Sequence, residues 1–238
     1  MMNIIRSKLR VLIAVPVLMA CLLLGFAAPA MAATSLALGD IAIIGFDTDG
    51  DDDFAFVLLK DIEAGTSIYI TDKGWNDGTG FYTVMGDGIW QWSTSADLDR
   101  GTVVYVKTTN SGIIEAGSLY TDRGTIVWIE DNSTAFSYMG DQLFFYQGTH
   151  TDPILLAGAH SNLEAGTTAA NWDGAATSAM TSALPDQLTN GSTAIWLYGP
   201  GPVERDNFKY NESLTEGTPS QLRAAIYNIS NWDVDDTN

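Results

Sequence analysis

The sequence predicts an all-β fold, a β-sandwich with one short helix near the C-terminus. Short runs rich in Ile, Val, Tyr, Phe and Trp follow one another along most of the chain, and residues typical of turns separate them. No helical periodicity intervenes between these runs. A chain of many short strands without helices between them is typical of a sandwich or a barrel.

The strands are predicted from runs with suitable length and composition. Several of these runs alternate in character, as in Ile68-Tyr69-Ile70, which is the pattern of a half-buried strand. The predicted strands span residues 41–46, 54–59, 67–71, 88–92, 102–107, 125–130, 142–147, 154–157 and 194–198.

Four of these strands begin with a similar sequence. An acidic or polar residue and a Gly come before a Thr and a β-rich run that holds an aromatic residue near its end. Gly supplies turn geometry and Thr favours the strand. The segments are EAGTSIYI (63–70), DRGTVVYV (99–106), DRGTIVWI (122–129) and, less closely, TNGSTAIWL (189–197). Recurring strand beginnings explain the pattern, with a repeated ligand site as the alternative; the irregular spacing argues against a solenoid.

Two regions depart from the strand pattern. Residues 162–184 are rich in Ala, Thr and Gly, which predicts a long loop with a short helix. Thr218-Pro219-Ser220-Gln221 predicts a helix start, because Thr218 can cap the helix and Gln221 can complete a capping box. One face of that helix is apolar, which predicts that it packs on the sandwich. The face consists of Leu222, Ala225, Ile226 and Ile229.

The N-terminus predicts export. Residues 1–32 combine Arg6, Lys8 and Arg10 with an apolar run and an Ala-Met-Ala site, which is typical of a cleaved signal peptide. A retained membrane anchor and lipidation at Cys21 are the alternatives. Residues 33–238 then form a single β-sandwich domain. This mature chain has no membrane span and no disulfide, since Cys21 is the only cysteine.

The charge restricts the partners. The chain has 29 acidic and 11 basic residues and a formal net charge of −18. Such a surface repels nucleic acid and anionic membranes, so no nucleic-acid partner is expected. It suits cation binding and solubility at high salt. The expected location is secreted or extracellular, with the periplasm as an alternative.

The segment FDTDGDDDF (46–54) is the strongest functional signal. Asp47, Asp49, Asp51 and Asp53 alternate, and calcium prefers a shell of carboxylate and carbonyl oxygens. DTDGD matches the start of the helix–loop–helix calcium loop, but Asp52 replaces its Gly and position 58 is Leu instead of Glu. The four alternating Asp residues are therefore candidate Ca²⁺ ligands in a strand-connecting loop. A solvated acidic turn explains the same residues, and both interpretations stay open.

The residue types needed for common catalytic centres are scarce. His150 and His160 are the only histidines, and both are interpreted as loop residues. No nucleophile elbow, phosphate loop or dinucleotide fingerprint occurs. No catalytic residue and no organic cofactor is therefore assigned, although an acid pair of the glycosidase type stays open.

Tryptophans offer a second kind of site. Trp90 and Trp92 share one face if their run is a strand, and Trp75 stands in a turn-rich segment. Such rings stack on sugars, although core packing is their commoner role.

Asp72 and Asp77 are candidates to lie near the acidic loop, which the sequence does not decide.

A family resemblance adds to this interpretation. GDIAIIGFDTDGDDDFAFVLLKDIEAGTSIYITDKGW resembles the opening of a group of uncharacterised secreted bacterial proteins. MGDQLFFYQG, SALPDQLTNGSTAIWL and DNFKYN followed by NW are similar to later blocks of the same group. The order of strand, acidic loop, strand, turn and GW is also distantly similar to the lamin-tail, immunoglobulin-like β-sandwich. The resemblance implies a secreted β-sandwich and transfers no catalytic residue.

Together these observations predict a secreted non-catalytic interaction or matrix protein with a calcium-stabilised acidic loop. The expected partner is an extracellular molecule or a glycan. Two alternatives stay open, a metal-assisted extracellular hydrolase and a carbohydrate-binding, lectin-like module.

Overall fold

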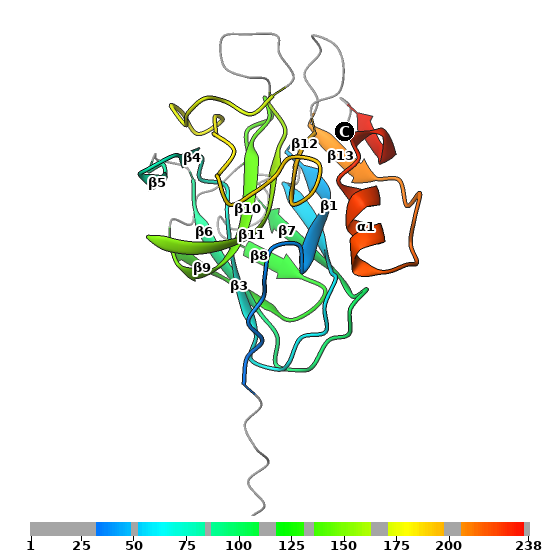
Figure 1. The fold of residues 1–238 in the computed structure, drawn as a ribbon. Coiled ribbons are helices and arrows are strands. Elements are labelled where there is room, and N and C mark those ends of the chain that lie inside the picture. Colours follow the sequence, from blue (N-terminus) through cyan, green and yellow to red (C-terminus); the bar gives the residue numbers. More distant parts are fainter. Residues whose placement is uncertain are drawn as a thin grey trace, which may run out of the picture. The chain divides into compact units, whose positions relative to one another are not determined.

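The computed structural model describes residues 32–48, 52–83, 87–109, 118–130, 136–162, 171–197 and 206–235. All of them belong to one compact unit, Met31–Asn238. Within these ranges most regular structure is β-sheet, with a single short α-helix near the C-terminus (Figure 1). The predicted all-β fold with a C-terminal helix is therefore confirmed.

The first sheet has six strands in the order β14-β13-β1-β2-β7-β8, and every neighbouring pair is antiparallel. Its core-facing residues come from alternate positions, so that Phe54 and Phe56 of β2 are buried while Ala55 between them is only partly buried. The strands are β1 (Ile41–Asp47), β2 (Asp53–Leu58), β7 (Val103–Thr109), β8 (Ser118–Thr121), β13 (Asn207–Tyr210) and β14 (Trp232–Asp235).

The second sheet also has six strands, in the order β12-β11-β10-β3-β6-β9. Only the β11–β12 pair among these is parallel. The strands are β3 (Ser67–Thr71), β6 (Ile89–Ser93), β9 (Thr125–Glu130), β10 (Gln142–Thr149), β11 (Asp152–His160) and β12 (Ala194–Trp196). A small hairpin, β4 (Trp75–Asn76) with β5 (Gly80–Phe81), follows β3 along the chain.

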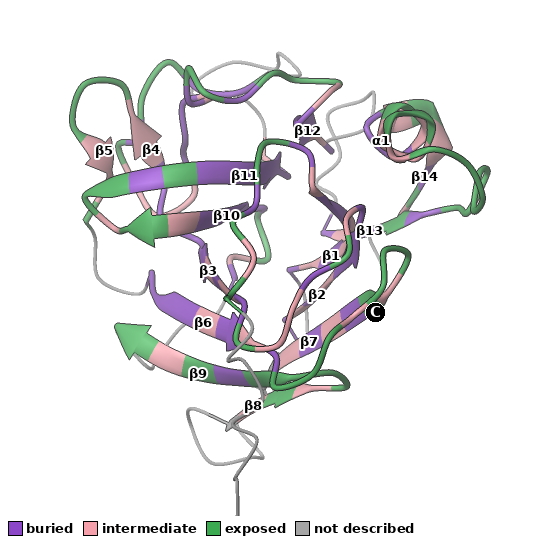
Figure 2. Ribbon diagram, turned by 60° about the horizontal axis from the view of Figure 1, so that its bottom comes forward, coloured by how far each residue is buried: buried purple, intermediate pink, exposed green. Residues whose placement is uncertain are grey.

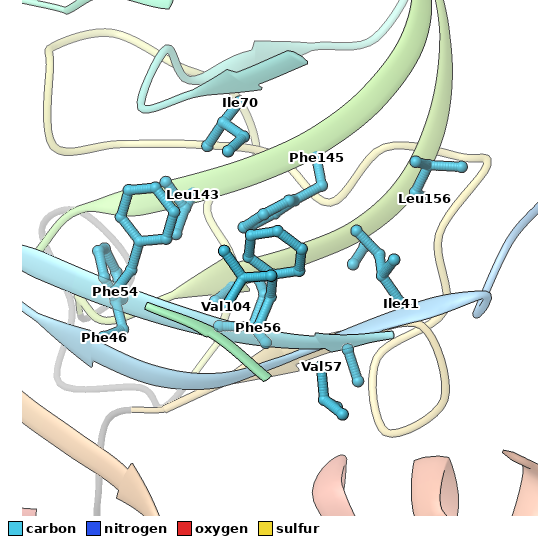
Figure 3. Close-up of a cluster of buried hydrophobic side chains, with 14 of the residues drawn as sticks. Ile41, Phe46, Phe54, Phe56, Val57, Ile70, Val104, Leu143, Phe145 and Leu156 are labelled. Carbon is cyan, nitrogen blue, oxygen red and sulfur yellow. The ribbon is translucent and has the colours of Figure 1, made fainter. Parts of the chain in front are cut away.

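The core lies between the two sheets. In Figure 2 the strands of the second sheet form one layer and those of the first sheet form the other. Aromatic rings from both layers meet: Phe56 contacts Trp92 and Phe145 with ring centroids 5.4 Å and 5.2 Å away. Figure 3 shows Phe54 and Phe56 of β2 directed toward Phe145 of β10, while Val57 points to the opposite side. This packing of two inner faces is a β-sandwich.

The helix forms as the sequence predicts. In α1 (Pro219–Ile226) the Thr218 side chain accepts a hydrogen bond from the Gln221 amide nitrogen, and the Gln221 side chain accepts one from the Thr218 nitrogen. Ile226 is buried, and Leu222 and Ala225 pack on the core cluster. A short 3-10 helix, η1 (Ile229–Asn231), then leads into β14.

The Ala- and Thr-rich region is a loop, as predicted, in the part that the structure describes. Residues 171–184 form turns, bends and two bridge residues, and no helix occurs among them. Residues 163–170 lie outside the described ranges. Within residues 171–184 side-chain bonds take the place of helical bonds, because the Thr181 hydroxyl accepts from the main-chain nitrogens of Thr177 and Ser178. Thr and Ser compete with helical hydrogen bonding in this way.

Candidate binding groove

The outer face of the first sheet carries a groove. Because Phe46 and Phe54 face the core, their neighbours Asp47, Asp53 and Ala55 face outward. The groove has a volume of about 590 Å³. Its charged lining side chains are Asp47, Asp53, Lys209, Glu212, Asp233 and Asp235.

Strand register builds the groove as two parallel rows across the sheet. One row joins Asp233, Lys209, Gly45, Ala55 and Tyr105 as successive Cα partners. The middle of this row is hollow, since Gly45 has no side chain and Ala55 has only a methyl group. A Cβ placed on Gly45 would lie 3.4 Å from the Ala55 Cβ, so the two residues fit closely side by side.

The second row is polar throughout. Successive Cα partners bring together Asp235, Asn207, Asp47, Asp53 and Lys107. The Tyr105 hydroxyl donates a hydrogen bond to Asp53 Oδ2, which ties the two rows together. Carboxylates on adjacent strands repel each other at this spacing, so a cation near Asp47 and Asp53 would relieve that repulsion.

The predicted acidic loop is described only at its two ends. Asp47 closes β1 and Asp53 opens β2, and the two are directly paired in the sheet. Asp49 and Asp51 lie outside the described residues. The pairing brings two of the four candidate ligands to the same edge of the groove.

Asp52 and Leu58 bear on the comparison with the helix–loop–helix calcium loop. Asp52 has φ 46°, the left-handed conformation for which that loop uses Gly. Leu58, at the position of the loop's bidentate Glu, is fully buried in β2. The interpretation that this is no helix–loop–helix site therefore agrees with the structure, because a core Leu supplies no ligand and strands flank the loop.

Asp72 and Asp77 lie away from this groove. Asp72 follows β3 at the end of the second sheet and is buried. Asp77 is exposed in the β4–β5 turn, where its carboxylate accepts a bond of 3.1 Å from Trp75 Nε1. Neither residue lines the groove, which is built from the first sheet, and their place beside the acidic loop stays a prediction because residues 49–51 lie outside the described ranges.

The interpretation of Trp90 and Trp92 as rings that stack on sugars is wrong, because both are buried. Trp90 and Trp92 do share one face of β6, but it is the core face, and both are fully buried. Trp75 is half-buried, with its ring edge-to-face with Phe81 at 5.2 Å. Neither Trp90 nor Trp92 is accessible to stack on a sugar.

The two histidines occupy different settings. His150 lies in the β10–β11 turn as predicted, and its ring stacks on Phe81 at 5.0 Å. Its pKa is lowered by burial and by the charge of Lys73. The loop prediction for His160 is wrong: it ends β11, is fully buried and stacks on Trp172 at 5.1 Å. β11 continues to His160, and all its residues from Leu155 onward are buried, so that no alternation marks the end of the strand.

A buried acidic cluster was not found from the sequence. It consists of Asp72, Asp87 and Asp141, whose residues are at most 3% exposed, beside the side chain of Gln142. The sequence does show an Asp beside each of three apolar strands. Asp72 directly follows β3, and a Gly-Asp pair ending in Asp87 or Asp141 comes just before β6 and β10. Only the pairing of these strands shows that their ends meet.

Comparisons with known proteins add no assignment: no family model, no curated protein and no solved structure matches this chain. Across the described ranges, no helix combines the length and apolar character needed to cross a bilayer. In those same ranges no three His, Cys, Asp or Glu side chains form a metal-binding group by themselves. The geometry and charge of the groove therefore carry the functional proposal.

Proposed function

We propose that this chain is an exported, non-catalytic β-sandwich that binds an extracellular partner through the groove of the first sheet. The observation that carries the proposal is the charge of that groove, where five carboxylates and one Lys line about 590 Å³. An excess of negative charge in a concave site attracts a partner of the opposite sign and orients it. The partner that fits this chemistry is a basic segment of an extracellular protein.

Export is proposed on the sequence of residues 1–32, of which 1–31 lie outside the described residues. The basic start, the apolar run and the Ala-Met-Ala site together support cleavage before Ala33. Mass spectrometry of the protein recovered from outside the cytoplasm should find Ala33 as the first residue. Recovery of the intact N-terminus with the membrane fraction would support a retained anchor instead.

The partner experiment uses a fluorescent oligolysine peptide of about ten residues as the probe. It should bind at low salt and lose most of its affinity at about 0.5 M NaCl, because screening weakens the attraction. Asp233→Asn with Asp235→Asn should weaken binding about tenfold or more. The matched control is Asp186→Asn, an exposed acid outside the groove.

Equal peptide affinity for the groove variant and the control would contradict the groove as the binding surface. Binding of neutral oligosaccharides with no binding of the basic peptide would contradict the basic partner and favour the lectin-like alternative. Both probes use the same protein preparations, so the two outcomes are directly comparable.

Calcium at the acidic loop is a further part of the proposal. Asp47 and Asp53 face the same edge of the groove, and Asp49 and Asp51 stand between them in the sequence. Calcium bound only by the folded chain stabilises it by about 1.4 kcal/mol at a free concentration ten times Kd. Millimolar calcium should raise the Tm, and Asp47→Asn with Asp53→Asn should reduce the increase; an unchanged increase would contradict the loop site.

A metal-assisted hydrolase is the second candidate. The favouring observation is that Asp47 and Asp53 line a concave surface, as catalytic carboxylates do. The test is hydrolysis of generic phosphodiester and nitrophenyl glycoside substrates with calcium, magnesium or chelator. Metal-dependent turnover that is lost in Asp47→Asn would establish this candidate over the non-catalytic function.

A further inference from the structure

Three aspartates meet at one end of the second sheet. Asp72 follows the last residue of β3, whereas Asp87 and Asp141 stand just before β6 and β10. Both neighbours of β3 are antiparallel to it, so the end of β3 lies beside the starts of β6 and β10. The exposed fractions of the three residues are 1%, 3% and 2%. The topology therefore concentrates acidic side chains in the interior.

Asp141 is held by hydrogen bonds from its surroundings. Its Oδ2 accepts from the Ser137 nitrogen at 2.9 Å. Its Oδ1 accepts from the Gln142 main-chain nitrogen and from Gln142 Nε2, each at 2.8 Å. These donors compensate part of the cost of burying the carboxylate.

Asp72 and Gln142 are not fully satisfied. Asp72 Oδ1 accepts from the Gly88 nitrogen at 2.7 Å, but Asp72 Oδ2 has no hydrogen-bond partner among the described residues. In the same ranges Gln142 Oε1 also has none. A buried acceptor without a donor costs about 1–3 kcal/mol. The two residues are in contact through Gln142 Nε2 and the Asp72 main-chain oxygen, so two unsatisfied buried acceptors belong to one cluster.

Oxygens outnumber donors around the Gln142 amide. Its Nε2 approaches the Asp72 main-chain oxygen, Asp141 Oδ1 at 2.8 Å and the Ala179 main-chain oxygen at 2.6 Å. An amide nitrogen has two hydrogens for these three oxygens. The amide nitrogen therefore links Asp72 to Asp141, while the amide oxygen is buried without a donor among the described residues.

The electrostatics agree with this shortage of positive charge. Burial raises the pKa of the Asp72 carboxyl well above its ordinary value, and the Asp87 carboxylate raises it further. Burial and then Asp72 raise the pKa of Asp141. The buried cation Lys73 is bonded to Glu130 at 2.7 Å, although its charge still favours the ionised form of Asp72.

We propose that this cluster binds a divalent cation of the calcium type through the carboxylates of Asp72 and Asp87 and the amide oxygen of Gln142. Calcium accepts six to eight oxygens, including amide and main-chain carbonyls. The proposed site has two carboxylates and one amide oxygen, so it is not a group of three His, Cys, Asp or Glu side chains. Zinc is disfavoured, because the named donors contain neither nitrogen nor sulfur ligands.

The proposed ligands of this site differ from those of the acidic loop. The loop candidates, Asp47 and Asp53, lie on the outer face at the groove, whereas Asp72 and Gln142 are interior residues of the second sheet. An ion at the interior site would join the ends of three neighbouring strands. Its role is to hold the sheet end together.

The test is calcium titration by calorimetry after treatment with chelator, at about pH 7. Wild-type protein should take up calcium at an interior site, and Asp72→Asn should weaken that uptake about 100-fold by removing one ligand charge. The matched control is Asp47→Asn with Asp53→Asn, which should retain the interior uptake. Loss in the control with retention in Asp72→Asn would overturn the interior site and support the loop site.

Terbium luminescence gives a second readout on the unmodified protein. Lifetimes in H₂O and D₂O count the waters on the bound ion, and an interior ion should hold at most about one, because the donors around it are buried. If every bound terbium ion carried several waters, the proposal would be overturned. It would also be overturned if Asp72→Asn stabilised the calcium-free protein without changing calcium uptake, since shared protons would then neutralise the cluster.

Discussion

At the scale of single residues, two aspartates in acid-rich regions are unusual, Asp52 in its backbone conformation and Asp72 in its burial. Asp52 adopts the left-handed conformation between two strands, which Asp tolerates better than most residues because its side chain bonds to nearby backbone. Asp72 is held in the interior with one oxygen unsatisfied within the described ranges. Each feature costs stability in the folded chain.

Trp90 and Trp92 give a matched test of a buried hydrogen bond. Trp92 Nε1 donates to the Arg123 oxygen at 2.7 Å, while Trp90 Nε1 has no partner among the described residues. Both rings are fully buried, so replacement by Phe removes similar volume. Trp92→Phe should cost about 1–2 kcal/mol more than Trp90→Phe, because only it breaks a bond. Urea unfolding measures the difference, and equal losses would contradict the assignment.

At the scale of elements, the Gly-Thr segments confirm the prediction that they begin strands. Each of the four glycines has positive φ, from 77° to 87°, and each precedes a strand by one to three residues. In two of the turns the Thr nitrogen bonds back to an oxygen three residues earlier, as in Thr66 to Glu63 and Thr102 to Asp99. The glycines of the four segments are Gly65, Gly101, Gly124 and Gly191.

Comparing alanine substitutions at Gly124 and Gly65 distinguishes the cost of backbone strain from the cost of a steric clash. Alanine at either position must adopt the left-handed conformation, which costs about 1–2 kcal/mol. A Cβ at Gly124 would lie 2.4 Å from the Ser93 oxygen, whereas nothing lies within 4 Å of one at Gly65. Gly124→Ala should therefore cost about 1–3 kcal/mol more than Gly65→Ala in chemical denaturation. A similar loss in both variants would show that the β8–β9 turn relaxes freely.

At the scale of the whole molecule, charge opposes the folded state. The formal net charge of −18 comes from 29 acidic and 11 basic residues, and like charges repel more strongly when the chain is compact. Sheet packing must therefore outweigh this repulsion. The aromatic contacts between the layers, such as Phe54 with Phe145 at 5.8 Å, belong to that packing.

Added salt should stabilise the protein by screening this repulsion. In chelator, raising NaCl from about 0.02 M to about 0.5 M shortens the Debye length severalfold and should increase the Tm. Choline chloride should have the same effect, since screening does not depend on the cation. A Tm that falls with salt would contradict net repulsion, and an increase with sodium alone would indicate a specific sodium site instead.

The limits of sequence-based prediction have physical causes. The predicted strands match the observed ones closely in the interior of both sheets, because apolar alternation there is strong. The strands β4, β5, β8, β13 and β14 were not predicted. β14, with the sequence WDVD, is half acidic and lies at the edge of its sheet, where only β13 pairs with it. Such a segment becomes a strand through its partner and not through its own composition.

The amino-acid sequence by itself determined the class of fold, the turn glycines, the capped helix and the acidic nature of the surface. These are local properties, since periodicity, backbone freedom and charge act over a few residues. Only the tertiary structure decided that Trp90 faces the core, that Asp47 and Asp53 line a groove, and that the ends of β3, β6 and β10 meet. The pairing of distant strands creates both sites, and no local pattern specifies which strands pair.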